Sequence, residues 1–313
     1  MQPVLEVRRV SKAFDRRNVI LKDVSFVLMR GEMVALIGAS GSGKSTLIRA
    51  IAGLVPIDRT GRRAAAASGD AADAPSDGPG EIILFGQSMQ RNGRISGAAT
   101  NLRVRVGVIF QQFNLVPRLS VLTNVCLGLL GRVPFLLGTI GRFSEADKCR
   151  AMHALDRVGI ATHALKRGCE LSGGQQQRAA IARTLVQGAE LVIADEPIAS
   201  LDPSSARRVM DILADMNRRD RITVLVSLHQ VEFALRYCPR AIALKAGEVV
   251  FDGPTRELTP ALLGAIYGAD FDELLIEGGD LPIPGRDVPV TITAGARFGD
   301  PRGEDSAPQR RRA

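Results

Sequence analysis

The sequence is poor in the residues that mark disulfide frameworks and metal centres. It has no tryptophan, two tyrosines, three histidines and four cysteines among its 313 residues. The cysteines, at positions 126, 149, 169 and 238, form no C-x-x-C pair, which disfavours a zinc site and is typical of reduced thiols. The histidines, at 153, 163 and 229, are too scattered to predict a metal cluster.

Long apolar runs are also missing. No stretch of about eighteen uncharged apolar residues is present, so we expect no membrane span. The nearest candidate, 125–143, contains Arg132 near its centre and Pro134. It is either a core segment or a surface that faces a partner. Residues 1–9 alternate like a strand, so we expect no secretory signal there.

The composition is that of a globular protein with a basic surface. The chain is 45% hydrophobic, enough for one large domain or two modest ones. Its formal net charge is +8. This charge suits nucleic acid, nucleotide phosphates or an anionic membrane surface equally well, so charge alone does not choose a partner.

A glycine-rich segment follows the predicted strand 33–37 and opens a predicted helix that ends near Gly53. Its residues are Gly38, Ala39, Ser40, Gly41, Ser42, Gly43, Lys44, Ser45 and Thr46. Glycines let successive N–H groups curl around an anion, and the helix adds its positive N-terminal end. We expect Lys44 to reach nucleotide phosphates and the Ser45 hydroxyl to ligate Mg²⁺. A glycine-rich turn with a hydroxyl cap is the simpler alternative.

Polar side chains end three more predicted strands. They are Gln111 after 104–110, Asp195 and Glu196 after 190–194, and His229 after 222–228. Ligands of α/β sheets bind at such strand ends. We expect Asp195 to hold Mg²⁺ through water, and Glu196 to orient or deprotonate an attacking water. His229 is expected to contact a γ-phosphate or that water, and Gln111 to meet Mg²⁺ or the water, although each has an ordinary structural alternative. Since neighbouring strand residues point to opposite sides, the two carboxylates can divide these two roles between them.

Two further helix starts combine capping residues with a possible contact to a ligand or partner. Ser172 is a natural N-cap for a helix that ends at Gly188. Gly173 and Gly174 follow it, although each glycine weakens a helix by about 1 kcal/mol relative to alanine. A helix start without side chains is what close contact with a phosphate requires. Asp202 before Pro203 is either a simple N-cap or a contact across an interface.

An aromatic side chain and three segments complete the prediction. Phe14 lies in a loop between two predicted antiparallel strands, where it either stacks on an adenine ring or packs into a small core, the more favoured interpretation from local sequence alone. Residues 112–170 are mostly helical in pattern. The segment at about 58–80 and the tail after 270 are rich in small, polar and charged residues, so we expect both to be loosely held.

These motifs, in this order, resemble those of the ATP-binding subunits of ABC transporters. The resemblance covers about residues 5–267 and implies an α/β fold of the P-loop NTPase type, with a mixed sheet core, an N-terminal antiparallel β-region and an inserted helical subdomain. We expect an ATPase domain over 1–270, with that subdomain at about 112–175, and a tail over 271–313. The resemblance implies ATP and Mg²⁺ as cofactors. It places Gln111 in the Q-loop, Asp202 in the D-loop and Phe14 at the position that stacks on adenine.

The resemblance further implies a head-to-tail dimer. Each ATP would be held by the phosphate loop of one copy and by the signature segment of the other, which comprises Ser172, Gly173, Gly174 and Gln175. The implied partners are integral membrane permease subunits and, indirectly, an extracytoplasmic solute-binding protein. No nucleic acid is expected. The implied location is the cytoplasmic face of the inner membrane.

Four stretches are similar to the phosphonate importer ATPases within this family. They are 108–116, 130–135, 194–203 and 229–238. An importer ATPase for another solute, such as phosphite, a phosphate ester or an amino acid, is the nearer alternative. A soluble ABC-type ATPase that acts on nucleic acid is less favoured, because the chain has neither a sustained heptad pattern nor an internal repeat. A purely regulatory module would need damaged catalytic residues, and none is damaged.

Overall fold

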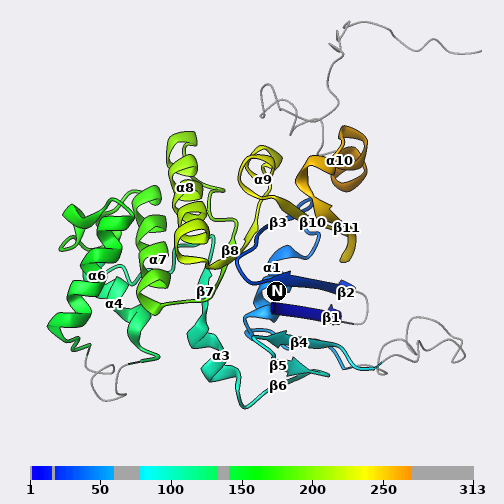
Figure 1. The fold of residues 1–313 in the computed structure, drawn as a ribbon, viewed down its shortest axis with the longest axis horizontal. Coiled ribbons are helices and arrows are strands. Elements are labelled where there is room, and N and C mark those ends of the chain that lie inside the picture. Colours follow the sequence, from blue (N-terminus) through cyan, green and yellow to red (C-terminus); the bar gives the residue numbers. More distant parts are fainter. Residues whose placement is uncertain (1, 16–17, 60–77, 133–140, 269–313) are drawn as a thin grey trace, which may run out of the picture.

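Two β-sheets form the centre of the molecule, in a computed structural model that describes residues 2–15, 18–59, 78–132 and 141–268 (Figure 1). The first is antiparallel, in the order β2-β1-β4-β5-β6. Its strands are β1 (Pro3–Ala13), β2 (Val19–Met29), β4 (Glu81–Leu84), β5 (Gln87–Arg91) and β6 (Arg94–Ile95). The antiparallel β-region predicted at the N-terminus is therefore confirmed. The segment expected to be loose at about 58–80 falls largely on 60–77, and the tail on 269–313, outside the described residues.

The second sheet is mixed and has the order β11-β10-β3-β9-β8-β7. Its strands are β3 (Met33–Ile37), β7 (Val106–Ile109), β8 (Leu191–Asp195), β9 (Thr223–Ser227), β10 (Arg240–Lys245) and β11 (Glu248–Pro254). All pairs are parallel except β10 with β11, which form the hairpin predicted around Ala246 and Gly247. Strands β3, β8 and β9 are buried along their whole length, as expected for parallel strands covered on both faces.

The helices divide into two sets by the core that they cover. They are α1 (Lys44–Ile51), α3 (Ala99–Arg105), α4 (Val121–Cys126), α6 (Glu145–Arg157), α7 (Gly173–Gln187), α8 (Pro203–Asp220), α9 (Val231–Tyr237) and α10 (Pro260–Tyr267), with short 3₁₀ turns η1 (Leu127–Leu129), η2 (Ala161–His163), η3 (Gly168–Glu170) and η4 (Thr255–Glu257). Alternate residues of β3 point to opposite faces. Val34 and Leu36 join a core with α1, α3 and the antiparallel sheet, whereas Ala35 and Ile37 join the core of the other helices.

One predicted strand begins too early. The strand expected over 104–110 is β7, at Val106–Ile109, because residues 99–105 form α3, which the sequence reading missed. Arg103 of α3 donates to the carbonyl oxygens of Ala52 (3.3 Å) and Gly53 (2.6 Å) just beyond α1. This tertiary contact satisfies carbonyls that the end of α1 leaves without partners, and it stabilises a short helix that local sequence does not predict.

The segment 125–143 is core in its first part. Val125, Cys126 and Leu129 are buried, whereas Leu130 is exposed and 133–140 lie outside the described residues. The alternative, a surface that faces a partner, stays a prediction for the rest. Among the described residues, no helix is both long and apolar enough to cross a membrane.

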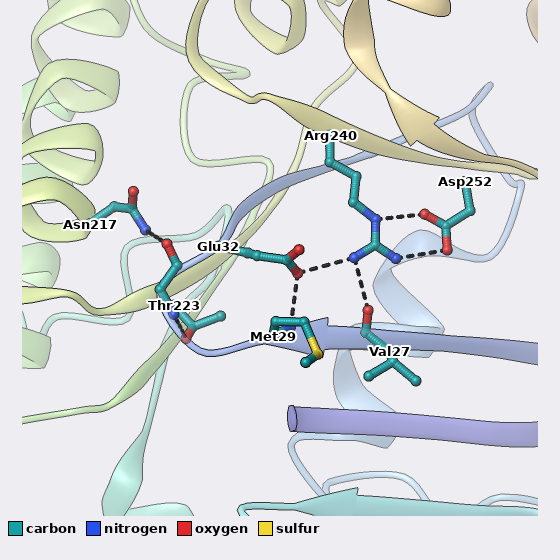
Figure 2. Close-up of polar contacts among 8 residues, drawn as sticks. Val27, Met29, Glu32, Asn217, Thr223, Arg240 and Asp252 are labelled. Carbon is teal, nitrogen blue, oxygen red and sulfur yellow. Dashed lines mark hydrogen bonds and ion pairs between the residues drawn. The ribbon is translucent and has the colours of Figure 1, made fainter. Parts of the chain in front are cut away.

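An arginine joins the edge of the mixed sheet to the antiparallel sheet (Figure 2). Arg240, the first residue of β10, makes two bonds to Asp252 of β11 (2.7 and 2.8 Å). Its remaining terminal nitrogen donates to the Val27 carbonyl and to Glu32, both at 3.0 Å. Glu32 in turn accepts the Met29 N–H. This network fixes the β2–β3 turn, from which β3 runs to the phosphate loop.

Candidate functional site

The predicted site residues follow neighbouring strands at one edge of the mixed sheet. In its register, Leu36 pairs with Ser227, Ser227 with Asp195, and Ile109 with Ala194. Parallel strands end at the same edge. The phosphate loop, the two carboxylates, Gln111 and His229 therefore leave the sheet side by side.

The phosphate loop has the backbone that its glycines predict. Gly38, Gly41 and Gly43 all have positive φ, at +145°, +76° and +105°. A Cβ at Gly38 would overlap the carbonyl oxygen of Leu244, so the β10 backbone packs directly behind the loop. Ser42 Oγ is buried and has no hydrogen-bond partner within the described part of the chain. A closely packed loop with an unpartnered polar atom is suited to bind a polar ligand.

The start of α1 is open to an anion. Gly43 supplies no side-chain cap, so no side chain of the N-cap residue occupies the first N–H groups of the helix. Lys44 is buried, and its ammonium donates to the carbonyl oxygens of Gly38 (2.7 Å) and Ala39 (3.1 Å). Burial lowers the pKa of Lys44, and the carboxylates of Glu196 and Asp195 oppose this shift. A phosphate here would meet helix N–H groups and a desolvated cation together.

Two hydroxyl groups hold Asp195. Ser45 donates to its Oδ1 at 3.1 Å and Ser227 donates to the same oxygen at 3.0 Å. Burial raises the pKa of Asp195, and the two hydroxyl hydrogen bonds act in the opposite direction. The predicted metal residues Ser45 and Asp195 are therefore in direct contact.

Glu196 has a different partner. His229 Nε2 and Glu196 Oε1 are 2.5 Å apart, and this hydrogen bond lowers the pKa of Glu196. The two carboxylates have different partners, but the alternation along a strand on which the sequence-based expectation rested is not the reason. Glu196 follows the last residue of β8 and has φ +49°, a left-handed conformation that is uncommon for a residue with a side chain. The Glu196 N–H donates to Ser227 Oγ (2.8 Å), which helps to fix this turn.

Two predicted site residues lie at the surface. Gln111 is exposed just beyond β7, and no hydrogen bond or ion pair of its side chain is present in the described part of the chain. Phe14 is 62% exposed, so the core interpretation favoured from local sequence is wrong. Lys12 Nζ lies 5.5 Å from the centre of its ring. An exposed ring is available for stacking, which stays a prediction.

The signature segment forms the start of α7 and satisfies part of its own backbone. Ser172 is the N-cap and Gly188 the left-handed C-cap, both as predicted. Ser172 Oγ accepts the Gln175 N–H (3.4 Å), and Gln175 Oε1 accepts the Ser172 N–H (3.0 Å). Among the described residues, no hydrogen bond or ion pair joins this segment to the phosphate loop. Within one chain the two predicted nucleotide contacts are therefore not joined by a hydrogen bond or an ion pair.

The two signature glycines have different surroundings. A Cβ at Gly174 would lie 2.8 Å from Ser205 Oγ, so packing against α8 explains this glycine without a ligand. A Cβ at Gly173 would meet Leu201 and Phe113 only at ordinary contact distance, 3.5 Å. Packing within one chain therefore does not explain why position 173 is glycine.

Asp202 caps α8, as predicted. Its Oδ1 accepts the N–H groups of Ser204 (3.1 Å) and Ser205 (3.0 Å) and the Ser204 hydroxyl (2.6 Å). These bonds lower the pKa of Asp202. The cap accounts for this residue within one chain, and its contact across an interface stays a prediction.

The sequence reading missed two residues that touch the site. Ser227 links Asp195 to the Glu196 backbone, and its only sequence signal is its polar place at the end of a β-branched strand, directly before Leu228 and His229. The hydroxyl of Tyr267, at the end of α10, accepts the Gly38 N–H at 3.3 Å. Burial raises the pKa of Tyr267 to about 12. No local pattern connects a residue to one 229 positions away.

Comparisons with known proteins identify the family of this chain. The family description "ABC transporter" matches residues 21–199. The phosphonates import ATP-binding protein PhnC of Stutzerimonas stutzeri is 52% identical over 276 residues, covering 88% of this chain and 94% of its own. The protein of that name in Caulobacter vibrioides is 50% identical, covering 88% of this chain and 97% of its own.

A dimeric structure of MJ0796, a bacterial ABC transporter cassette, has a TM-score of 0.65 at 31% identity and covers 81% of this chain and 100% of that one. A second dimeric structure, of MJ0796 after hydrolysis and bound to ADP and Pi, has a TM-score of 0.63 at 30% identity, again over 81% of this chain and 100% of that one.

Proposed function

The chain belongs to the ABC transporter family, and from this membership we propose that it is the ATP-hydrolysing subunit of an importer that takes up phosphonates. The proposal of ATP hydrolysis is supported by the edge of the mixed sheet, where a phosphate loop, two separately held carboxylates and a histidine lie together. The proposal that the cargo is a phosphonate is supported by relatives named for phosphonate import, which match this chain over nearly their whole length. The carboxylate–histidine pair at that edge is the single observation that carries hydrolysis.

ATP would bind at the phosphate loop. Backbone N–H groups of the loop after Gly38, up to Thr46 at the start of α1, would surround its phosphates. Lys44 would exchange its carbonyl contacts for the β- and γ-phosphates. The exposed ring of Phe14 would stack on the adenine, since a flat aromatic face binds a base without reading its edge.

Mg²⁺ is the proposed metal cofactor, and the residues present fit it. Ser45 would ligate the ion through its hydroxyl and Asp195 would hold it through water, and the two oxygens lie 3.1 Å apart. Oxygen ligands are the chemistry that Mg²⁺ prefers. Among the described residues, no group of three or more histidine, cysteine or carboxylate side chains could form an all-protein cage. Phosphate oxygens and water would therefore complete the coordination, with Gln111 a proposed further ligand. When bound, the ion would neutralise charge on the β- and γ-phosphates.

Glu196 is the proposed base for hydrolysis. Its carboxylate would accept a proton from water as the water oxygen bonds to the γ-phosphorus. The bond from that phosphorus to the β–γ bridging oxygen would break, leaving ADP and inorganic phosphate. His229 would hold Glu196 in place and contact the γ-phosphate. The lowered pKa of Glu196 keeps it ionised at neutral pH, as a base requires.

The second half of each ATP site would come from another copy of the chain. The signature segment is exposed at Ser172 and unconnected to the phosphate loop of its own chain. In a head-to-tail dimer the Ser172 hydroxyl and the backbone of Gly173 and Gly174 would meet the γ-phosphate, and Asp202 would lie at the interface. Loss of the γ-phosphate would remove this contact and let the copies part.

Opening and closing of the dimer would drive membrane permease subunits. We retain the division of the chain into an ATPase domain (1–270), with a helical subdomain at about 112–175 that receives the permease, and a tail (271–313). The chain would work at the cytoplasmic face of the inner membrane, and a solute-binding protein on the other side would deliver cargo. The roles proposed for the site residues all concern the nucleotide, so permease and binding protein would select the cargo.

The test of hydrolysis is Glu196→Gln. Loss of the base should lower turnover by a factor on the order of 10² to 10⁴ while ATP binding persists, so Mg-ATP should trap a dimer. ATPase rate and sedimentation with Mg-ATP measure the two effects. Glu145→Gln, on the exposed face of α6, is the matched control and should behave as the parent. Undiminished hydrolysis by the Glu196 variant would refute the role of this residue.

The proposal that the cargo is a phosphonate can be tested by the growth of a deletion strain. A strain that lacks this chain should not grow on a phosphonate as sole phosphorus source, and should recover when the gene is restored. Growth of the deletion strain would favour another solute, such as phosphite or an amino acid. DNA binding that weakens steeply with salt and stimulates ATPase activity would favour a nucleic-acid function instead.

A further inference from the structure

A histidine contacts the last residue of the signature segment. His163, the final residue of η2, places its Nε2 3.2 Å from Nε2 of Gln175. Its other ring nitrogen, Nδ1, lies 3.0 Å from Thr162 Oγ1. Both His163 and Gln175 are half-buried. Within the part of the chain that the structure describes, the imidazole has no other polar partner.

The capping box fixes which way the Gln175 amide faces. Gln175 Oε1 accepts the Ser172 N–H, so its NH₂ group is the end directed at His163. An NH₂ group can only donate. His163 Nε2 must therefore accept, which requires a neutral ring that carries its proton on Nδ1 and donates to Thr162 Oγ1. The three polar groups form one consistent chain of hydrogen bonds.

We propose that neutral His163 is a positioning residue that holds the Gln175 amide in the orientation that caps α7, and that protonation of His163 weakens the ATP-driven dimer. The proposal rests on the proposed function, in which Ser172 and Gln175 meet the ATP of a second copy. Because Ser172 Oγ accepts the Gln175 N–H, its own O–H is left to donate to a phosphate oxygen.

Protonation would place two donors face to face. A charged imidazole has N–H groups at both positions, so Nε2–H would oppose the Gln175 NH₂. Turning the amide over would restore that bond but point NH₂ at the Ser172 N–H and break the cap. Histidine is the side chain whose charge most commonly changes between about pH 5 and 8, so the tests compare pH 8 with pH 6.

The charged side chains on the elements around His163 form no ion pair with its imidazole among the described residues. They are Asp156 and Arg157 of α6, Arg178 of α7, and Lys166, Arg167 and Glu170 after η2. Arg178 donates to the carbonyl oxygens of Val158 and Gly159, and Arg157 pairs with Asp215 and Asp220. Among the described residues, none of these groups is within ion-pair distance of the imidazole.

The contact itself can be tested without nucleotide. In the ¹⁵N-labelled full chain, the Gln175 side-chain NH₂ and Ser172 amide signals should shift together between pH 8 and pH 6. His163→Gln carries an acceptor near the position of Nε2 that does not titrate, so it should abolish these shifts. His153→Gln, at an exposed histidine of α6, should leave them unchanged. Signals that do not titrate in the parent chain, or that still titrate in His163→Gln, would overturn the contact.

The functional consequence can be measured in the Glu196→Gln background. The Mg-ATP concentration that gives half-maximal dimer should rise about fivefold from pH 8 to pH 6, the effect of one lost hydrogen bond. Adding His163→Gln should reduce this rise to less than about twofold and keep the pH 8 value, whereas His163→Ala should weaken the dimer at both pH values. An unchanged acid response with His163→Gln overturns the proposal. Absence of an ATP-driven dimer at either pH would instead overturn the proposed function, while the NMR result stands independently.

Discussion

Two helix starts in this molecule are built in opposite ways. Helix α1 begins after Gly43, in the left-handed conformation and with no side-chain cap. Helix α7 begins after Ser172, whose hydroxyl and partner Gln175 occupy two of the backbone N–H groups. The first start leaves its donors for a ligand, whereas the second has two of its N–H groups bonded within its own chain. A phosphate alone therefore has much to gain at α1 and less at α7.

The surroundings of the two helix starts also differ: the phosphate loop is closely packed, whereas the signature serine is exposed. The phosphate loop is packed from behind by the Leu244 carbonyl and by the Tyr267 hydroxyl, and Lys44 is buried within it. Ser172 is exposed, and its capping partner Gln175 contacts His163. In the proposed dimer, changes at α1 should therefore remove nucleotide binding itself, whereas changes at α7 should affect only association of two copies.

The largest effect should come from Lys44→Ala. Removing the one buried cation of the loop should weaken Mg-ATP binding by about 100-fold or more, because a charge-assisted contact to phosphate is lost in a desolvated site. Isothermal titration with Mg-ATP measures this. Lys148→Ala, on the exposed face of α6, is the control. Parent-like affinity in the Lys44 variant would contradict the difference between the two helix starts.

Ser172→Ala should have a smaller and different effect. The dimer of the Glu196→Gln background should need about tenfold more Mg-ATP, since both the cap and the phosphate contact are lost. Binding of Mg-ATP to the monomer should stay unchanged. Ser144→Ala removes a capping box of the same design from α6, so it reports the loss of a cap alone. If the two variants dimerise equally well, the signature serine acts only as a cap.

Acid should also weaken Mg²⁺ binding beside the phosphate loop. Since burial raises the pKa of Asp195, protons compete with Mg²⁺ at a higher pH than at an ordinary aspartate. Mg²⁺ affinity of the ATP-loaded chain should therefore fall as the pH falls through that raised pKa, by up to about tenfold per pH unit. Asp202, whose pKa is lowered, should stay ionised over the same range. Mg²⁺ titration of the parent and Asp195→Asn measures this, and the variant controls for protonation of ATP itself.

Features of the fold that are caused by residues close together in sequence could be predicted. The Ser172 and Gly188 caps, the Asp202–Pro203 start and the three loop glycines follow from rules that act within a few residues, and the structure has each of them. Strands β3, β8 and β9 were also found, because continuous β-branched and apolar runs mark buried parallel strands.

Contacts between distant segments could not be predicted in this way. Helix α3 was missed because Arg103 stabilises it through the end of α1, about 50 residues away in sequence. Phe14 was placed in a core because an isolated phenylalanine is usually buried, yet the end of β1 leaves it 62% exposed. The Glu196 turn, held by Ser227, likewise comes from the packing of β8 beside β9.

The smallest effect should come from the support behind the phosphate loop. Tyr267→Phe removes the acceptor of the Gly38 N–H and keeps the ring that fills the core, so the loop should stay folded but hold its first amide less firmly. ATP affinity should fall about two- to fivefold and kcat should not change, because the hydroxyl is remote from Glu196 and His229 in the hydrogen-bond network. The other tyrosine supplies the control, since the Tyr237 hydroxyl donates to Asp211 on the surface and Tyr237→Phe should change neither value. An equal loss of kcat and affinity in the Tyr267 variant would mean that α10 supports the whole sheet edge and not the loop alone. The phosphate loop would then have no separate support to distinguish it from the signature segment.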